Sequence, residues 1–198
     1  MKPYAPACDR NGPPILDILR QTFCNVQHVL EIGSGTGQHA VFFAPQLPHL
    51  IWQPSDRVEN LPGIQAWMEE NPSPNLAPPI ALDVDGSWPE TQFDGLFSAN
   101  TLHIMGMESV IRFWQGLGQV CSAGATVCIY GPFNVGGQYT SESNAAFDIW
   151  LKDRDPLSAI RDLETIESLA QENGFFLAAN HAMPANNQML VFHKQEAE

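Results

Sequence analysis

Short apolar runs alternate with amphipathic segments along most of the chain. Seven runs have the length and residue content of buried strands, and they cover residues 29–32, 50–53, 80–84, 93–100, 125–130, 175–182 and 188–193. Segments with apolar residues at helical spacing separate most of them, and they cover residues 39–46, 57–70, 109–120, about 144–152 and 162–173. Strands that alternate with helices predict an α/β fold, in which helices cover both faces of a parallel sheet.

The two ends of this series depart from the alternation. Before the first strand, Ile15, Leu19 and Phe23 share one face of an expected helix, for which Asn11 is a possible N-cap. At the other end, the turn at 183–187 is too short for a crossover helix, so the last two strands must run antiparallel. We therefore expect a mostly parallel seven-stranded sheet with an antiparallel last strand. A single domain over 1–198 is expected, with a helical lead-in at 1–25 and a lid-like excursion at 131–160.

Three alternating glycines, Gly33, Gly35 and Gly37, follow the first strand and precede a helix. Glycine permits unusual φ/ψ values and lets a ligand approach the backbone, and the helix start behind it offers free N–H groups. A dinucleotide fingerprint places its third glycine one residue later. The spacing therefore disfavours a nucleotide-dependent oxidoreductase, although glycine turns of this kind also occur without a ligand.

Acidic residues close the second and third expected strands. Asp56 follows the glycines by roughly 20 residues, which is the position where a ribose is held through its hydroxyls. Asp83 closes the next strand. Asp56 is also placed to cap the expected helix over 57–70, and the two roles are compatible.

Composition narrows the class of partner. The formal net charge is −13, and the chain has only nine Lys and Arg residues, whereas a nucleic-acid surface needs clustered cations. We therefore expect no nucleic-acid partner, and a small molecule or a protein instead. The four cysteines form no C-x-x-C pair and have no zinc spacing with the histidines, so we expect no metal site. The N-terminus lacks a signal-peptide core and no apolar run approaches the roughly 20 residues of a membrane span, which favours a cytoplasmic protein without a membrane partner.

The glycine loop preceded by Glu31, the two acids and the closing hairpin together resemble class I S-adenosylmethionine-dependent methyltransferases, which have a Rossmann-like fold. More specifically, the chain is similar over essentially its whole length to the domain of unknown function 938 family. The shared segments are 7–11, 31–39, 52–56, 99–104, 130–133, 141–144, 147–148, 161–162 and 184–187.

The resemblance implies S-adenosyl-L-methionine as the cofactor. In that family the glycine loop wraps the methionine part, Asp83 would face the adenine amino group, and the end of the fourth strand abuts the transferable methyl. The cofactor-binding residues implied are Glu31, Gly33, Ser34, Gly35, Thr36, Gly37, Asp56, Asp83, Val84 and Asn100.

A methyl acceptor is expected at the same edge, because ligands of open α/β sheets bind beyond the carboxyl ends of the strands. The excursion after the fifth strand is long for such a connection, which is typical of lids and binding loops. The candidate acceptor residues are Asn11, Asn134, Ser141, Asn144, Asn186 and Asn187. The last two also suit left-handed turn geometry, so a purely conformational role stays open.

Methyl transfer from a sulfonium is an in-line displacement with a neutral leaving group, so positioning matters most and a general base is optional. His103 follows the fourth strand and is a candidate base. Tyr139 is a candidate for orienting or covering the acceptor. Structural roles in the loop and the lid are the alternatives for both.

The sequence thus predicts a methyltransferase that acts on an unidentified small molecule, as a monomer or homodimer. Two alternatives remain. The chain is a non-catalytic cofactor-binding or regulatory module, or it is a protein methyltransferase whose acidic surface docks a basic partner.

Overall fold

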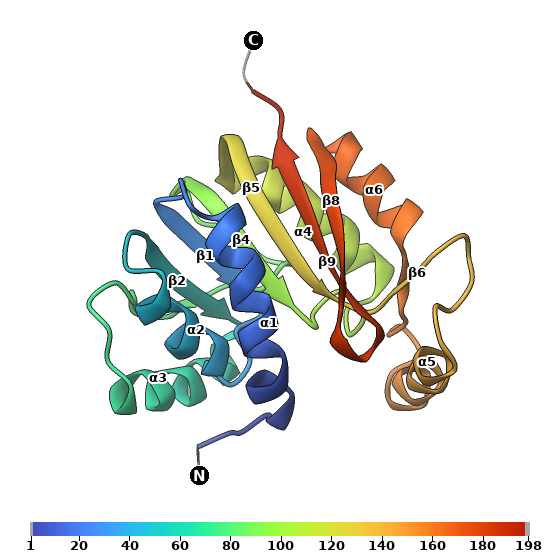
Figure 1. The fold of residues 1–198 in the computed structure, drawn as a ribbon, viewed down its shortest axis with the longest axis horizontal. Helices are drawn as coiled ribbons and strands as arrows, with labels where there is room; N and C mark the ends of the chain where they lie inside the picture. The colour runs from blue at the N-terminus through green and yellow to red at the C-terminus, as the bar shows by residue number, and fades with distance from the viewer. Residues whose placement is uncertain (1, 197–198) are drawn as a thin grey trace.

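The computed structural model describes residues 2–196, and a seven-stranded sheet runs through its centre (Figure 1). The strands are β1 (His28–Ile32), β2 (Ile51–Asp56), β3 (Ile80–Ala81), β4 (Phe93–Ala99), β5 (Cys121–Gly131), β8 (Phe175–Met183) and β9 (Asn187–Lys194). Their order is β3-β2-β1-β4-β5-β9-β8. The first five pair in parallel, and β9 is antiparallel to both β5 and β8. The predicted sheet is confirmed.

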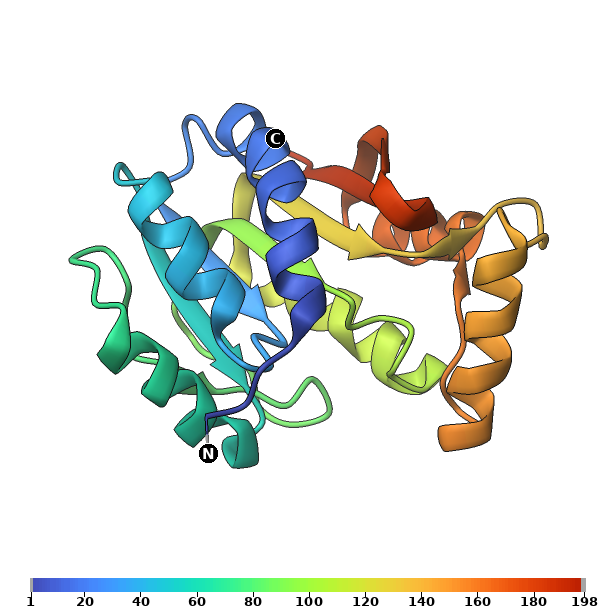
Figure 2. The same cartoon turned by 60° about the horizontal axis from the view of Figure 1, so that its bottom comes forward.

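Helices cover both faces of this sheet, as predicted. On one face lie α1 (Pro6–Thr22), α2 (Gln38–Phe43) and α3 (Leu61–Glu70), and on the other lie α4 (Met107–Val120) and α6 (Leu163–Glu172). The remaining helix, α5 (Glu142–Arg154), stands apart from both layers in the two views (Figure 1, Figure 2).

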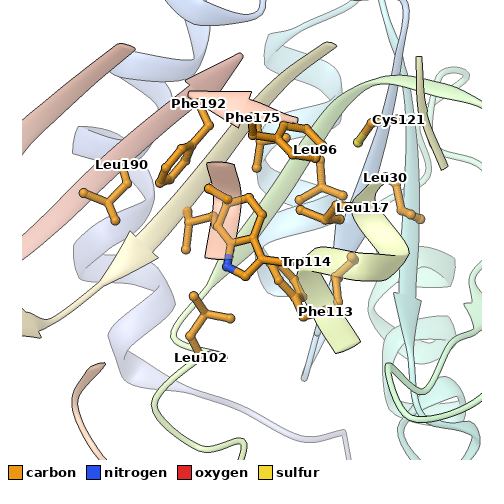
Figure 3. Close-up of a cluster of buried hydrophobic side chains, with 14 of the residues drawn as sticks. Leu30, Leu96, Leu102, Phe113, Trp114, Leu117, Cys121, Phe175, Leu190 and Phe192 are labelled. Carbon is orange, nitrogen blue, oxygen red and sulfur yellow. The ribbon is translucent and has the colours of Figure 1, made fainter. Parts of the chain in front are cut away.

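Alternation along the strands divides the core in two. Leu30, Leu96 and Val127 face α4 and α6, whereas their chain neighbours face α1 and α2, because successive strand residues point to opposite sides. Trp114 of α4 lies at the centre of the first half (Figure 3), with its ring 5.0 Å from that of Phe192.

The first helix differs from the prediction. It begins at Pro6, so Asn11 lies inside α1 and is not its cap, and Pro13 and Pro14 are inside the helix as well. These prolines remove two backbone hydrogen bonds. The carbonyls that lose their donors belong to Asp9 and Arg10, which are exposed, so water can hydrate them.

The bounds of several other elements also differ from those predicted from the sequence. The third strand ends at Ala81 because the chain turns at Asp83, whose carbonyl accepts from Gly86 N at 2.9 Å. The helix expected over 57–70 opens with a 3-10 turn at Val58–Asn60, and α5 is longer at both ends than predicted. A small parallel sheet of β6 (Phe133–Asn134) and β7 (Arg161–Asp162) was not predicted, since pairs of two residues carry no periodic pattern.

Candidate functional site

A cleft of about 680 Å³ lies at the carboxyl ends of β1, β2 and β4. Its volume is within the usual range for small-molecule sites. The structure brings eight of the ten predicted cofactor residues to its walls: Gly33, Ser34, Gly35, Thr36, Asp56, Asp83, Val84 and Asn100. The other two, Glu31 and Gly37, do not line the cleft.

The three loop glycines all have positive φ, and the surroundings of the missing side chain differ among them. A Cβ on Gly33 would lie 2.8 Å from Thr101 Oγ1, and one on Gly37 would lie 2.9 Å from Ile64 Cα. These two glycines are therefore needed for packing. A Cβ on Gly35 would meet nothing within 4 Å. Gly35 thus keeps open space at the cleft wall, where a ligand can approach the backbone.

The Asp56 carboxylate organises the loop and the turn that follows β2. Its Oδ2 accepts from Gly35 N at 2.6 Å, and its Oδ1 accepts from Arg57 N at 2.7 Å and Asn60 Nδ2 at 2.8 Å. These bonds hold the carboxylate at the cleft wall, with its orientation fixed before any ligand binds.

Glu31 lies beneath the loop and is 1% exposed. Its Oε2 accepts from Trp52 Nε1 at 2.9 Å. Burial raises the pKa of the Glu31 carboxyl to about 7, although hydrogen bonds with Trp52 and Ser34 act in the opposite direction. Direct contact between Glu31 and a cofactor stays a prediction.

The far wall of the cleft comes from the residues after β3 and β4. Asp83 is exposed, and its Oδ1 accepts from Asp85 N at 3.0 Å, whereas Val84 is buried. Asn100 takes a left-handed conformation with φ of 57°, which asparagine tolerates better than most residues. The chain therefore leaves β4 sharply, with Asn100 in the cleft lining.

The two candidate catalytic residues do not line the cleft. His103 is buried, and its ring lies edge-on to that of Phe147 at 5.3 Å. Burial lowers the pKa of His103 to about 4, and the positive charge of Arg161 acts in the same direction. Tyr139 donates from its hydroxyl to Asp148 Oδ2 at 2.7 Å. Their catalytic roles stay predictions.

Three of the candidate acceptor residues join the start of α5 to the β8–β9 turn. Ser141 caps α5 by accepting from Asn144 N at 3.1 Å. Asn144 Nδ2 donates to Asn186 O at 3.0 Å, and Asn186 Nδ2 donates to Ser143 Oγ at 3.1 Å. Asn186 also has a φ of 58°, which is the left-handed turn conformation that a purely conformational role of this residue would need.

The other three are dispersed. Asn11 Oδ1 lies 2.7 Å from His39 Nε2. Asn134 Nδ2 lies 3.4 Å from Ile160 O, and Asn187 donates to carbonyls of its own turn. Acceptor binding by all six residues stays a prediction.

The excursion between β5 and α6 is fixed by two buried charges. The Asp148 carboxylate accepts from Ile160 N at 2.7 Å in addition to Tyr139. Arg161 donates to the carbonyls of Leu102, Met105 and Leu157. Arg161 thereby joins the excursion to the loop after β4, which forms a wall of the cleft.

Several cleft residues were not among the candidates named from the sequence. Cys8 comes from the first turn of α1, so the lead-in borders the cleft, and His39 comes from the first turn of α2. A histidine directly after the glycine loop was the available signal. Asp155 follows α5, within the lid-like excursion expected at 131–160, and closes one side of the cleft.

Within residues 2–196, no group of three or more His, Cys, Asp or Glu side chains is arranged to hold a metal ion. In the same part of the chain, none of the helices has both the length and the apolar character needed to cross a membrane.

The sheet order and the position of the glycine loop define the class I methyltransferase fold. The chain belongs to the family described as "Protein of unknown function (DUF938)", whose model matches residues 2–194.

Solved methyltransferase structures share this fold. The S-adenosylmethionine-dependent methyltransferase SibL superposes with a TM-score of 0.81 at 21% identity, over 96% of this chain and 56% of its own. An O-methyltransferase family protein from Burkholderia thailandensis superposes with a TM-score of 0.84 at 12% identity, over 97% of this chain and 58% of its own. Human N-acetylserotonin methyltransferase, in complex with SAM, superposes with a TM-score of 0.80 at 13% identity, over 96% of this chain and 53% of its own. The chain therefore spans little more than half the length of these structures.

Proposed function

We propose that this chain is an S-adenosylmethionine-dependent methyltransferase that acts on a small molecule. One observation carries the proposal: a single cleft is lined by the open glycine loop at Gly35, the carboxylates of Asp56 and Asp83, and Asn100 at the end of β4. These are the positions where the resemblance expects the methionine part, the ribose, the adenine and the methyl group.

The residues present fit this cofactor. Gly35 leaves room for close approach, and Leu82 and Val84 give an apolar wall for a purine. Four carboxylates, from Asp56, Asp83, Asp85 and Asp155, line the cleft, and the single lysine or arginine in the lining, Arg57, pairs with Glu59 at 2.9 Å. This excess of negative charge favours a sulfonium cation.

When bound, the cofactor supplies a methyl group on a sulfonium, which leaves as a neutral thioether. The chain's contribution is to orient both ligands and to exclude water. Asp56 is oriented by Gly35, Arg57 and Asn60 before binding, so little reorganisation is needed.

Two points support a small-molecule acceptor. The cleft is bounded by α1, the loop after β4 and Asp155, which restricts the space beside Asn100. The structures described above include a family protein named an O-methyltransferase and the methyltransferase of N-acetylserotonin. His103, Tyr139 and the six amide and hydroxyl residues are our candidates for acting on the acceptor.

A non-catalytic cofactor-binding module is the second candidate. It is favoured by one observation, namely that neither His103 nor Tyr139 lines the cleft.

Incubation with methyl-labelled S-adenosylmethionine and a metabolite extract tests the proposal. We expect label in a low-mass product, and we expect it to vanish in Gly35→Arg, which places a long side chain in the cleft. Cofactor binding without any labelled product would favour the non-catalytic module. Label that appears only in protein would favour a protein methyltransferase.

A further inference from the structure

His39 is a polar cleft residue with no assigned role. It is 7% exposed, and its ring is held between two phenylalanines, stacked on Phe43 at 5.2 Å and edge-on to Phe97 at 5.9 Å. Packing of this kind fixes the plane of the imidazole. His39 nevertheless remains part of the cleft lining.

Asn11 sets the tautomer of this ring. Its Oδ1 lies 2.7 Å from His39 Nε2. An amide oxygen accepts hydrogen bonds and cannot donate them, so the ring nitrogen is the donor of this pair. It follows that Nε2 carries the proton and that Nδ1 is an unprotonated acceptor.

Nδ1 of His39 is not sealed inside the protein. Within residues 2–196, the buried side-chain nitrogen and oxygen atoms that lack a partner are Trp114 Nε1 and Asn134 Oδ1. No hydrogen bond to His39 Nδ1 is formed in that part of the chain, so this atom is accessible to solvent, and the 680 Å³ cleft is a cavity that His39 lines. Burial lowers the pKa of His39 to about 4, and no charged side chain contributes to that shift, so the ring stays neutral at pH 7.

We propose that His39 Nδ1 accepts a hydrogen bond from an N–H or O–H group of a molecule bound in the cleft, with Asn11 as the positioning residue. The identity of that molecule rests on the proposed function. The donor is either the ammonium group of the cofactor or a hydroxyl or amine of the methyl acceptor. A carboxylate or phosphate dianion has no proton to donate, so it does not satisfy this position.

Two substitutions distinguish the contribution of Nδ1 from that of Nε2. His39→Asn keeps an amide oxygen at the δ position of the side chain, where Nδ1 lies. His39→Gln instead keeps an amide nitrogen at the ε position, where Nε2 donates to Asn11, and has no acceptor at the δ position. Equal thermal unfolding of the two variants provides the control for folding.

The experiment measures binding of S-adenosylhomocysteine and of its analogue without the amino group, together with transfer of labelled methyl to a metabolite extract. If the donor is the cofactor ammonium, His39→Gln weakens S-adenosylhomocysteine binding by about 10-fold or more, as expected for a charged hydrogen bond, and leaves the analogue unaffected. If the donor is the acceptor, S-adenosylhomocysteine binding is unchanged and labelled product falls by a similar factor. In both cases His39→Asn retains most of the wild-type value.

Three results would overturn the inference. The first is wild-type behaviour of His39→Gln in every assay, and the second is equal impairment of both variants. The third is a nitrogen NMR spectrum of the free protein that shows the proton of His39 on Nδ1. Failure of the wild type to bind S-adenosylhomocysteine would instead reject the proposed function, and this inference would fall with it.

Discussion

Two buried titratable residues, Glu31 below the glycine loop and His39 in the cleft lining, have pKa values that burial shifts in opposite directions. The pKa of Glu31 rises to about 7 and that of His39 falls to about 4, because burial disfavours the charged form of each. The sequence placed Glu31 in a strand expected to be buried, but it could not show that Trp52 would donate to this carboxylate. It could not show the hydrogen bond from His39 to Asn11 either, since that contact depends on the packing of α1 against α2.

The pH dependence of stability tests the burial of Glu31. Between its ordinary pKa of 4.5 and its folded pKa of about 7, the folded protein holds a proton that the unfolded chain releases. Stability therefore falls as pH rises through this window. Glu31→Gln cannot titrate and keeps an oxygen for Trp52 Nε1. We expect the variant to match the wild type near pH 4.5 and to exceed it by about 3 kcal/mol above pH 8.

Urea unfolding at several pH values gives this difference directly. His39 and His103, whose pKa values are lowered, act in the opposite direction, with stability lost as pH falls from about 6.5 to 4. They are present in both proteins, so they cancel in the comparison. Parallel pH profiles for the two proteins would show that the carboxyl of Glu31 is hydrated.

Among the elements, α4 shows how a helix positions the cleft. A Cβ on Gly116 would lie 1.9 Å from the Trp88 ring, whereas one on Gly118 would be 3.7 Å from its nearest neighbour. Trp88 Nε1 in turn donates to Val84 O at 3.3 Å. Packing of the Trp88 ring against α4 at Gly116 thus fixes the segment that places Val84 in the cleft wall.

We expect opposite effects from alanine at these two glycines. Gly118→Ala should raise stability by about 1 kcal/mol, because alanine is the better helix former. Gly116→Ala should lower it by about 1–3 kcal/mol through overpacking, and it should also weaken S-adenosylhomocysteine binding. Denaturant unfolding and calorimetry of both variants check this, and equal stabilisation by the two would contradict the role of Trp88.

Element boundaries were less predictable than the elements themselves. The strands with long apolar runs, β4 and β5, were found from their pattern, whereas the pairing of β6 with β7 has only two residues on each side and leaves no trace in the sequence. The start of α1 at Pro6 was missed for a different reason. Pro13 and Pro14 favour a helix start, but tertiary contacts carry the helix through both.

At the scale of the whole molecule, the sheet brings distant segments to one edge. Gly33–Gly37, Asp56, Asp83 and Asn100 are consecutive strand ends, so their convergence followed from the parallel topology alone and could be predicted. The part of the site expected to bind the methyl acceptor could not be predicted in this way, because it depends on how the excursion between β5 and α6 folds. Hydrogen bonds accepted by Asp148 and donated by Arg161 hold that segment, and a sequence pattern does not encode such long-range polar contacts.

Calorimetric titration with S-adenosylhomocysteine of the wild type, Gly35→Ala and Gly136→Ala tests the central claim, that the glycine-loop cleft is the cofactor site. The two glycines are matched, with φ of 57° and 59° and nothing within 4 Å of an added Cβ, so the backbone strain of each substitution is similar, about 1–2 kcal/mol. Gly35 lines the cleft, whereas Gly136 lies between β6 and α5. We predict wild-type affinity for Gly136→Ala and a loss of about 10-fold or more for Gly35→Ala. Equal affinities for the two variants, or no binding by the wild type at millimolar ligand, would contradict it.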